Sequence, residues 1–181
     1  MSAPAPMMMT TRPAPSTSTR AMRRRRVESQ LLGAMIVNED AILEFPDGLF
    51  GFAAHKHWVL VTAGRPGWCW LHAIDHPALA FLLVDPFESF PEFAVELTKQ
   101  DLAVLGAADA TQVAVFAIVT LPRAAGDALT ANLQGPVAIA LPSRRGRQLA
   151  LGDARFGARA PLGVDHATAA QVLRGPDDTE A

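Results

Sequence analysis

Short apolar runs alternate with turn-forming residues along most of the chain. These runs span 27–32, 35–37, 41–45, 57–62, 68–74, 79–84, 113–121, 137–141 and 148–151. Runs of this length that are rich in β-branched and aromatic residues are typical of strands. The run at 113–121 (VAVFAIVTL) is continuous, so we expect it to form a strand that is buried on both faces.

Glycine and proline mark the ends of several runs. Gly33 separates the first two runs, which predicts a hairpin, and Pro46-Asp47-Gly48 follows the third run. Proline fixes φ and glycine permits a positive φ, so both residue types favour tight turns.

Only one segment has the signals of a helix. Thr98 and Asp101 have the spacing of an N-terminal cap, Leu102 and Leu105 share a face, and Gly106 ends the turn. Strands that follow one another with almost no helix between them indicate an all-β fold, as an antiparallel sandwich or barrel. The length of 181 residues suits a single domain.

The net charge of −2 is unevenly distributed. Residues 1–26 contain six arginines and no acid, so this segment carries +6 and the remainder carries −8. Residues 1–26 have no apolar period, and we expect a disordered basic arm. We place the folded domain at 27–164 and a polar C-terminal tail at 165–181.

The basic arm also permits another function. The arginines at 20 and 23–26 could make the chain an RNA-binding module, whose affinity would fall steeply with salt. We expect no direct nucleic-acid binding by the folded domain, because an acidic surface does not neutralise phosphates. No stretch of eighteen apolar residues is free of breakers and charges, so we expect no membrane association.

Catalytic motifs are absent from the sequence, which lacks G-x-S-x-G, G-x-x-x-x-G-K-[ST] and H-E-x-x-H. The candidates for a zinc site are His55, His57, His72, His76 and Cys69. Nothing in their spacing brings them together, so we expect loop and turn roles and no metal or other cofactor. A hydrolase or ligand-binding barrel that uses the His and Asp residues of 72–85 would need a roomy pocket.

The segment 85–93 (DPFESFPEF) combines three phenylalanines, two prolines and three acids. Its prolines preset the backbone, so that little entropy is lost when a partner docks, and exposed aromatics rimmed by acids suit a basic protein. We expect at least one ring to fold into the core. The residues that we expect to contact a partner are Asp85, Phe87, Glu88, Phe90 and Glu92.

Six motifs occur in the order found in one protein family. They are 44–52 (EFPDGLFGF, family pattern F-P-[ED]-G-[IL]-P-G-F), 79–86 (LAFLLVDP), 90–93 (FPEF, where the family has F-P-D-Y), 115–120 (VFAIVT), 130–133 (TANL) with Pro136, and 145–148 (RGRQ). Each motif alone is weak, but the ordered set covers about 27–161. On these motifs the sequence resembles the flagellar assembly factor FliW family.

The resemblance implies a compact β-barrel-like fold and a cytoplasmic, non-enzymatic protein that switches between partners. Family members bind flagellin. When flagellin is exported they bind and antagonise the translational regulator CsrA, which relieves repression of flagellin mRNA translation. CsrA is basic, and complementary charge on the acidic domain would favour the encounter.

The sequence departs from the family pattern at three aromatic positions. Phe50 replaces the usual Pro of P-G-F, and Phe93 and Phe156 stand at or near positions where Tyr is common. Replacing Tyr by Phe keeps the ring and loses a hydroxyl with any hydrogen bond that it makes.

The motif at 44–52 suggests a structural turn, and Asn132 suggests a possible contact residue. We expect a barrel-shaping turn from Phe45, Pro46, Gly48, Gly51 and Phe52. Gly48 and Gly51 supply the backbone angles of that turn. Asn132 is a further candidate for partner contact in a loop between strands, or it hydrogen-bonds its own turn.

Overall fold

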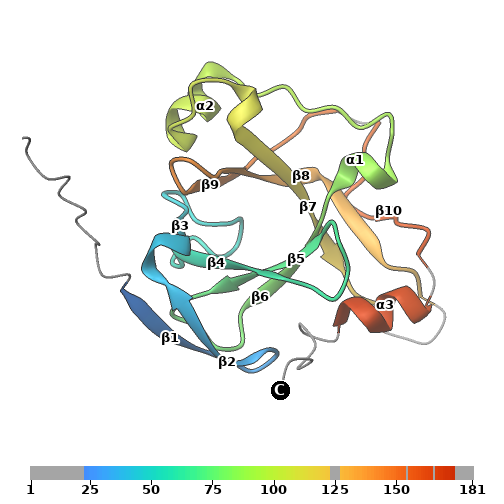
Figure 1. The fold of residues 1–181 in the computed structure, drawn as a ribbon. Coiled ribbons are helices and arrows are strands. Elements are labelled where there is room, and N and C mark those ends of the chain that lie inside the picture. The colour runs from blue at the N-terminus through green and yellow to red at the C-terminus, as the bar shows by residue number, and fades with distance from the viewer. Residues whose placement is uncertain (1–22, 123–126, 154, 165, 174–181) are drawn as a thin grey trace, which may run out of the picture.

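The computed structural model describes residues 23–122, 127–153, 155–164 and 166–173, which form strands and short helices (Figure 1). The strands are β1 (Arg24–Ser29), β2 (Gly33–Asn38), β3 (Ile42–Glu44), β4 (His57–Thr62), β5 (Trp68–Ala73), β6 (Ala80–Val84), β7 (Val113–Thr120), β8 (Thr130–Ala140), β9 (Arg145–Gln148) and β10 (Ala160–Pro161). The α-helices are α1 (Pro86–Ser89), α2 (Lys99–Leu105) and α3 (His166–Leu173), and two 3-10 turns lie at Glu39–Ala41 and Ala110–Gln112.

Strands β3 to β9 form a closed barrel. Their order is β8-β7-β6-β5-β4-β3-β9, and β9 returns to pair with β8. All neighbouring strands are antiparallel except β3 and β9, which run parallel and pair Glu44 with Arg145. The prediction of an all-β antiparallel fold is confirmed, and the barrel is realised rather than the sandwich.

One face of the barrel strands fills the interior. Its buried cluster contains Leu43, Phe45, Leu49, Trp58, Leu71, Ala73, Leu83, Val137 and Ile139. The rings of Phe45 and Trp58 meet edge to face with centroids 6.1 Å apart. Gly146 of β9 makes room for Phe45, because a Cβ at this position would lie 2.1 Å from the Phe45 ring. This glycine is therefore required by packing.

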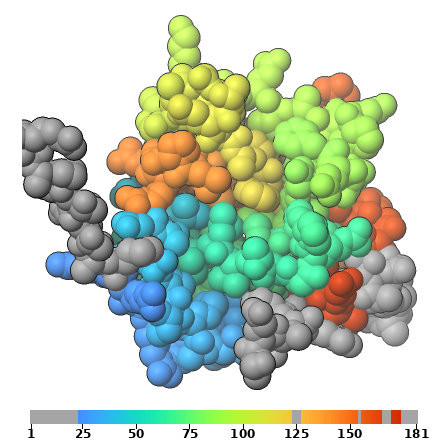
Figure 2. Space-filling model, viewed as in Figure 1, coloured from blue at the N-terminus to red at the C-terminus, as the bar shows by residue number. Residues whose placement is uncertain are grey.

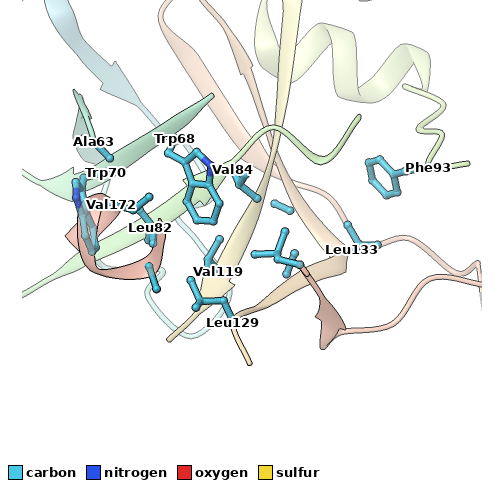
Figure 3. Close-up of a cluster of buried hydrophobic side chains, with 14 of the residues drawn as sticks. Ala63, Trp68, Trp70, Leu82, Val84, Phe93, Val119, Leu129, Leu133 and Val172 are labelled. Atoms are coloured by element: carbon cyan, nitrogen blue, oxygen red, sulfur yellow. The ribbon is translucent and has the colours of Figure 1, made fainter. Parts of the chain in front are cut away.

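Three segments cover the outer face of the barrel. The β1–β2 hairpin packs Val27 and Val37 against Val59 of β4 and against Ile74, which follows β5. Helix α2 packs Leu105 against β8. The segment from about 151 to 173, which includes α3, joins the cluster on the outer faces of β5 to β8, and Val172 is fully buried there (Figure 3).

Helix α2 confirms the helix expected from the sequence. The Thr98 side chain accepts a hydrogen bond from the Asp101 backbone, the Asp101 side chain accepts one from Thr98 N, and Gly106 ends the helix with φ 63°. The expected number of one helix was too low, because α1 and α3 are also present. Helix α1 is a single turn in a proline-rich loop and gives no helical period, and α3 lies in the segment that the sequence assigned to a polar tail.

Both expected domain boundaries need correction. Residues 24–26 belong to β1 and the Arg23 carbonyl accepts a hydrogen bond from Glu39 N at 2.9 Å, so the arm is ordered from residue 23. At the other end, Ala169 and Val172 of α3 are buried, so the packed domain extends beyond residue 164. The remainder of the expected arm (1–22) and of the expected tail (174–181) lies outside the described residues.

Two strands differ from their predicted form. In β7 only Ala117 and Val119 are buried, whereas burial on both faces was expected. Pairing with β6 is confined to Ala117 and Ile118, so among the described residues the first half of β7 has no paired strand on that side. Strand β8 begins at Thr130, seven residues before the predicted start at Val137. No helix among the described residues is long and apolar enough to cross a membrane.

Candidate functional site

The turn α1 presents the segment that the sequence singled out. The Asp85 carboxylate accepts a hydrogen bond from Phe87 N at 2.9 Å, and Pro86 occupies the first helical position. Phe90 N donates to the Pro86 carbonyl and Phe93 N donates to the Phe90 carbonyl, both at 2.9 Å. These short hydrogen-bonded turns hold the segment in one shape, which lowers the entropy lost when a partner binds.

A row of aromatic rings anchors this segment. Phe93 is buried, and its ring centroid lies 5.5 Å from that of Phe87 and 5.0 Å from that of Phe156. Phe87 itself is 46% exposed. Figure 3 shows Phe93 and Leu133 at one end of the outer cluster, with Trp70 and Val172 at the other. The expectation that at least one phenylalanine folds into the core is confirmed by Phe93.

A groove of about 500 Å³ opens between this segment and the C-terminal segment. Phe90 and Phe93 line one side, Phe156 lines the other, and Leu133 of β8 also contributes. The Leu133 N–H donates to the Gly157 carbonyl at 3.0 Å, which ties the C-terminal wall to the barrel. The groove thus has an apolar lining on a fixed frame, as expected of a site for an apolar side chain of a partner.

The charged groups around the groove differ between its two sides. Glu92 is exposed and lines the groove on the loop side, whereas the exposed Glu88 does not line it and has its carboxylate beside Gly67. On the opposite side the Arg155 Nε donates to an Asp153 oxygen at 2.9 Å, and the guanidinium lies 5.3 Å from the Phe156 centroid. The Arg155 side chain, by hydrogen bonding, lowers the pKa of Asp153. Because the one guanidinium of Arg155 interacts with both Asp153 and Glu92, the net charge of these three groups is negative.

The predicted contact residues of the segment 85–93 differ in their exposure and position. Phe87, Glu88 and Glu92 are exposed, while Phe90 is half-buried and lines the groove. Asp85 is half-buried and caps α1, so it positions the segment.

Asn132 lies within β8, and the loop expected for it is not formed. Its side-chain oxygen accepts hydrogen bonds from Gln134 N at 3.1 Å and from Gly135 N at 3.0 Å. This matches the local hydrogen-bonding role that the sequence left open for Asn132.

The motif at 45–52 forms a turn between β3 and β4. Gly48 has φ 71°, and a Cβ there would lie 2.7 Å from Ala53 Cα, while Gly51 has φ 81°. The Pro46 carbonyl accepts a hydrogen bond from Lys56 Nζ at 2.8 Å. The ring of Phe52 packs on Phe81 with centroids 5.1 Å apart. The motif therefore forms a fixed turn.

Phe50 is the most exposed phenylalanine of this turn. Its side chain is 59% exposed, and its backbone N–H donates to the Gln148 side chain at 2.8 Å. Gln148 also donates to the Gly135 carbonyl at 2.9 Å, so one buried amide joins this turn to β8 and β9. Phe50 is therefore an exposed ring that does not line the groove.

The histidines do not assemble into a metal site. Among the described residues no group of three His, Cys, Asp or Glu side chains is placed to hold an ion. His55 hydrogen-bonds Asp75 at 3.0 Å, whereas His72 is buried within β5 and does not cap a turn as expected. Cys69 is also largely buried, and burial raises the pKa of its thiol to about 12.

Sequence reasoning missed one wall of the groove. Arg155, Phe156 and Gly157 lie more than sixty residues after the loop that they face. Phe156 was noted only as a replacement for tyrosine. No local pattern links the two segments, because the barrel alone brings them together.

Comparison with known proteins shows a match over most of the chain. A family model described as FliW protein matches residues 26–162. A protein of Natranaerobius thermophilus named flagellar assembly factor FliW is 32% identical over 148 residues, which cover 81% of this chain and 97% of that protein. The protein of the same name from Symbiobacterium thermophilum is 39% identical over 125 residues, which cover 68% of this chain and 90% of that protein.

A solved structure shows the same architecture. The crystal structure of the flagellar assembly factor FliW superposes with a TM-score of 0.72 and 28% identity, covering 78% of this chain and 99% of that chain. The matched range of the family model includes both walls of the groove. It excludes Arg23, Arg24, Arg25 and helix α3.

Proposed function

The chain belongs to the FliW family, and from that premise we propose that it is a flagellar assembly factor that acts by binding partner proteins. The family match across residues 26–162 is the observation that carries this proposal. It is supported by the same barrel in a FliW crystal structure.

The proposed action is an exchange of partners in the cytoplasm. The protein binds newly made flagellin, and when flagellin has been exported it binds CsrA and relieves repression of flagellin mRNA translation. In this scheme the protein regulates by being occupied and performs no chemical reaction. The fixed frame of the groove supports this mode, because a preformed surface can exchange ligands without refolding.

The groove beside α1 is the proposed contact surface. Phe90 lines the groove, and Phe87, whose ring packs on the lining residue Phe93, supplies exposed aromatic area beside it; aromatic side chains are frequent energetic centres of interfaces. Glu92 adds negative charge on the rim and Glu88 adds negative charge elsewhere on the same segment, which suits a basic partner such as CsrA. The groove therefore takes an apolar side chain of the partner, and the rim favours a cationic residue next to it.

The test is co-purification of the tagged full-length protein from its own cells, with the captured proteins identified. We expect flagellin and CsrA in the eluate. A competition titration then measures CsrA affinity with and without saturating flagellin, and we expect flagellin to displace CsrA. Absence of both proteins from the eluate, together with no measurable binding of either purified partner, would contradict the proposal.

A further inference from the structure

The described arginines at the start of β1 are not neutralised by the fold. Arg23, Arg24 and Arg25 are exposed, and none forms an ion pair with another described residue. Arg26 differs, because its Nε contacts Glu28 at 2.6 Å. These arginines precede the range matched by the family model, so they are a feature of this chain beyond the shared domain.

Strand β1 also has an open backbone edge. The Arg23 carbonyl bonds Glu39 N on the β2 side, whereas Gln30 N donates away from β2 to the Pro77 carbonyl. Successive residues of an antiparallel strand direct their backbone groups to alternate sides. The backbone N–H groups of Arg24 and Arg26 therefore point away from β2, and no strand among the described residues pairs with that edge.

The strand geometry determines the directions and spacing of the arginine side chains. Alternate residues lie about 7 Å apart along a strand, so that Arg23 and Arg25 project from one face and Arg24 from the other. Arg25 borders a cavity of about 350 Å³ together with Arg144, Glu39 and Glu44. Two of these neighbours have partners of their own, because Arg144 pairs with Asp40 and Glu44 pairs with Arg145.

The hairpin and the groove lie at different ends of the molecule. Figures 1 and 2 show the blue β1–β2 hairpin at the lower left and the green segment around α1 at the upper right. A ligand on one surface would leave the other accessible, so the two surfaces can act independently.

We propose that the arginine edge of β1, formed by Arg23, Arg24, Arg25 and the open backbone N–H groups, binds the phosphate backbone of single-stranded RNA without base specificity. The guanidinium groups of Arg23 and Arg25 on one face of the strand and of Arg24 on the other can each neutralise a phosphate of a chain that follows the open edge between them, and the outward N–H groups can donate to phosphate oxygens. A regularly charged polymer fits such an edge better than a peptide with irregularly spaced carboxylates. No base-reading element is required, because contacts to phosphates carry affinity without sequence information.

The hairpin is less suited to a membrane surface. Its exposed apolar side chains, Leu31 and Ile36, stand apart, with Leu31 in the turn and Ile36 opposite Arg26. Interfacial binding needs a continuous apolar face as well as positive charge. Electrostatic binding to RNA requires only the charged edge.

The experiment measures binding of the full chain to fluorescein-labelled oligo(U) RNA by anisotropy between 50 and 200 mM KCl. The variant carries Arg23→Gln, Arg24→Gln and Arg25→Gln. Each phosphate neutralised on a single strand contributes about 0.7 to the slope of log K against log salt, so the variant should lose about two units of slope. Oligo(A) should give the same slopes as oligo(U).

A matched control removes three charges elsewhere. The variant Arg65→Gln, Lys99→Gln, Arg159→Gln changes exposed residues away from β1 and should retain the wild-type slope. Replacing Arg23, Arg24 and Arg25 by lysine should also retain most of the slope, because the charge is kept. This lysine variant distinguishes lost charge from a damaged strand.

Three results would overturn the proposal. They are an unchanged slope in the β1 glutamine variant, an equal loss in the control variant, and binding to anionic vesicles or poly-glutamate with none to RNA. Flagellin binding by the β1 glutamine variant should remain as in the wild type. A failure of the RNA experiment with flagellin binding intact would therefore leave the proposed function in place.

Discussion

Two phenylalanines from different parts of the molecule show how one residue type serves two purposes. Phe45 lies inside the barrel with no exposed surface, against Gly146 and Trp58. Phe87 lies on α1 with nearly half of its surface exposed, and only one side of its ring packs on Phe93. The first ring fixes the architecture, whereas the second offers apolar area at the edge of a groove.

This difference separates the two most distinctive sequence motifs. The motif at 44–52 contributes to the resemblance to the family, yet its glycines and Phe45 serve to build a turn and fill the barrel. The segment 85–93 is divided, because Phe93 is an anchor and Phe87, Glu88 and Glu92 face solvent. A motif that identifies a family need not be the surface by which the family acts.

The largest effect is expected inside the barrel. Phe45→Ala should lower the free energy of unfolding by about 3–5 kcal/mol, because it removes a fully buried ring and leaves a cavity. Urea denaturation followed by tryptophan fluorescence measures the change. A loss below about 1 kcal/mol would show that Phe45 does not support the barrel.

The alkylation rate of the Cys69 thiol also tests how well the barrel interior is protected. Its pKa is raised to about 12 by burial, compared with 9.0 for a free thiol, so the thiolate at pH 8 should be about a thousandfold scarcer than in the unfolded chain. Iodoacetamide should therefore modify the native protein far more slowly than the urea-unfolded protein. Similar rates in both states would mean that the barrel opens readily at β5.

Phe87→Ala tests the other side of the comparison. We expect the affinity for flagellin or CsrA to fall by at least about tenfold, because the ring offers exposed aromatic area beside the groove, with little change in stability because the ring is already half exposed. Adding Phe90→Ala should weaken binding further. Calorimetric titration measures the affinities, and thermal unfolding measures the stability.

Phe50→Ala is the matched control for this experiment. It also removes an exposed ring, but from the turn at 45–52, and should leave both affinities unchanged. If Phe50→Ala weakens binding and Phe87→Ala does not, the contact surface lies at the turn and the assignment of the two regions is reversed.

The smallest effect is expected at α2, which covers the barrel without lining the groove. Thr98→Ala should cost about 1 kcal/mol of stability, because it removes the side chain that accepts from Asp101 N at 3.1 Å. Chemical denaturation measures this change, and partner affinity should stay constant. A changed affinity would extend the contact surface to α2.

The sequence was most informative where structure is local. The β1–β2 hairpin, the turn at Pro46-Asp47-Gly48, strand β4 and the capping box of α2 each depend on residues close together in the chain, and all four are found. The hairpin differs in detail, because it turns at 30–32 and Gly33 is the first residue of β2. Strand β8 was predicted seven residues short, because Asn132, Gly135 and Pro136 have turn propensity. In the structure Asn132 satisfies the backbone of this irregular region, so the strand continues through it.

Only one of the two walls of the groove could be predicted from the sequence. Residues 85–93 carry a local signal, since prolines and phenylalanines alternate with acids. The opposite wall at Phe156 becomes apparent only when β8 and the C-terminal segment are tied by the Leu133–Gly157 hydrogen bond. Long-range pairing of this kind depends on the whole barrel and leaves no pattern in a short window.

Hydrogen exchange of the full chain with and without saturating flagellin, read by mass spectrometry, tests the central claim most directly. The account predicts slower exchange in 86–93 and 155–157, the two walls of the groove, with unchanged exchange at 46–52 and in β1. Protection confined to 46–52 or to β1, with the groove unaffected, would contradict it.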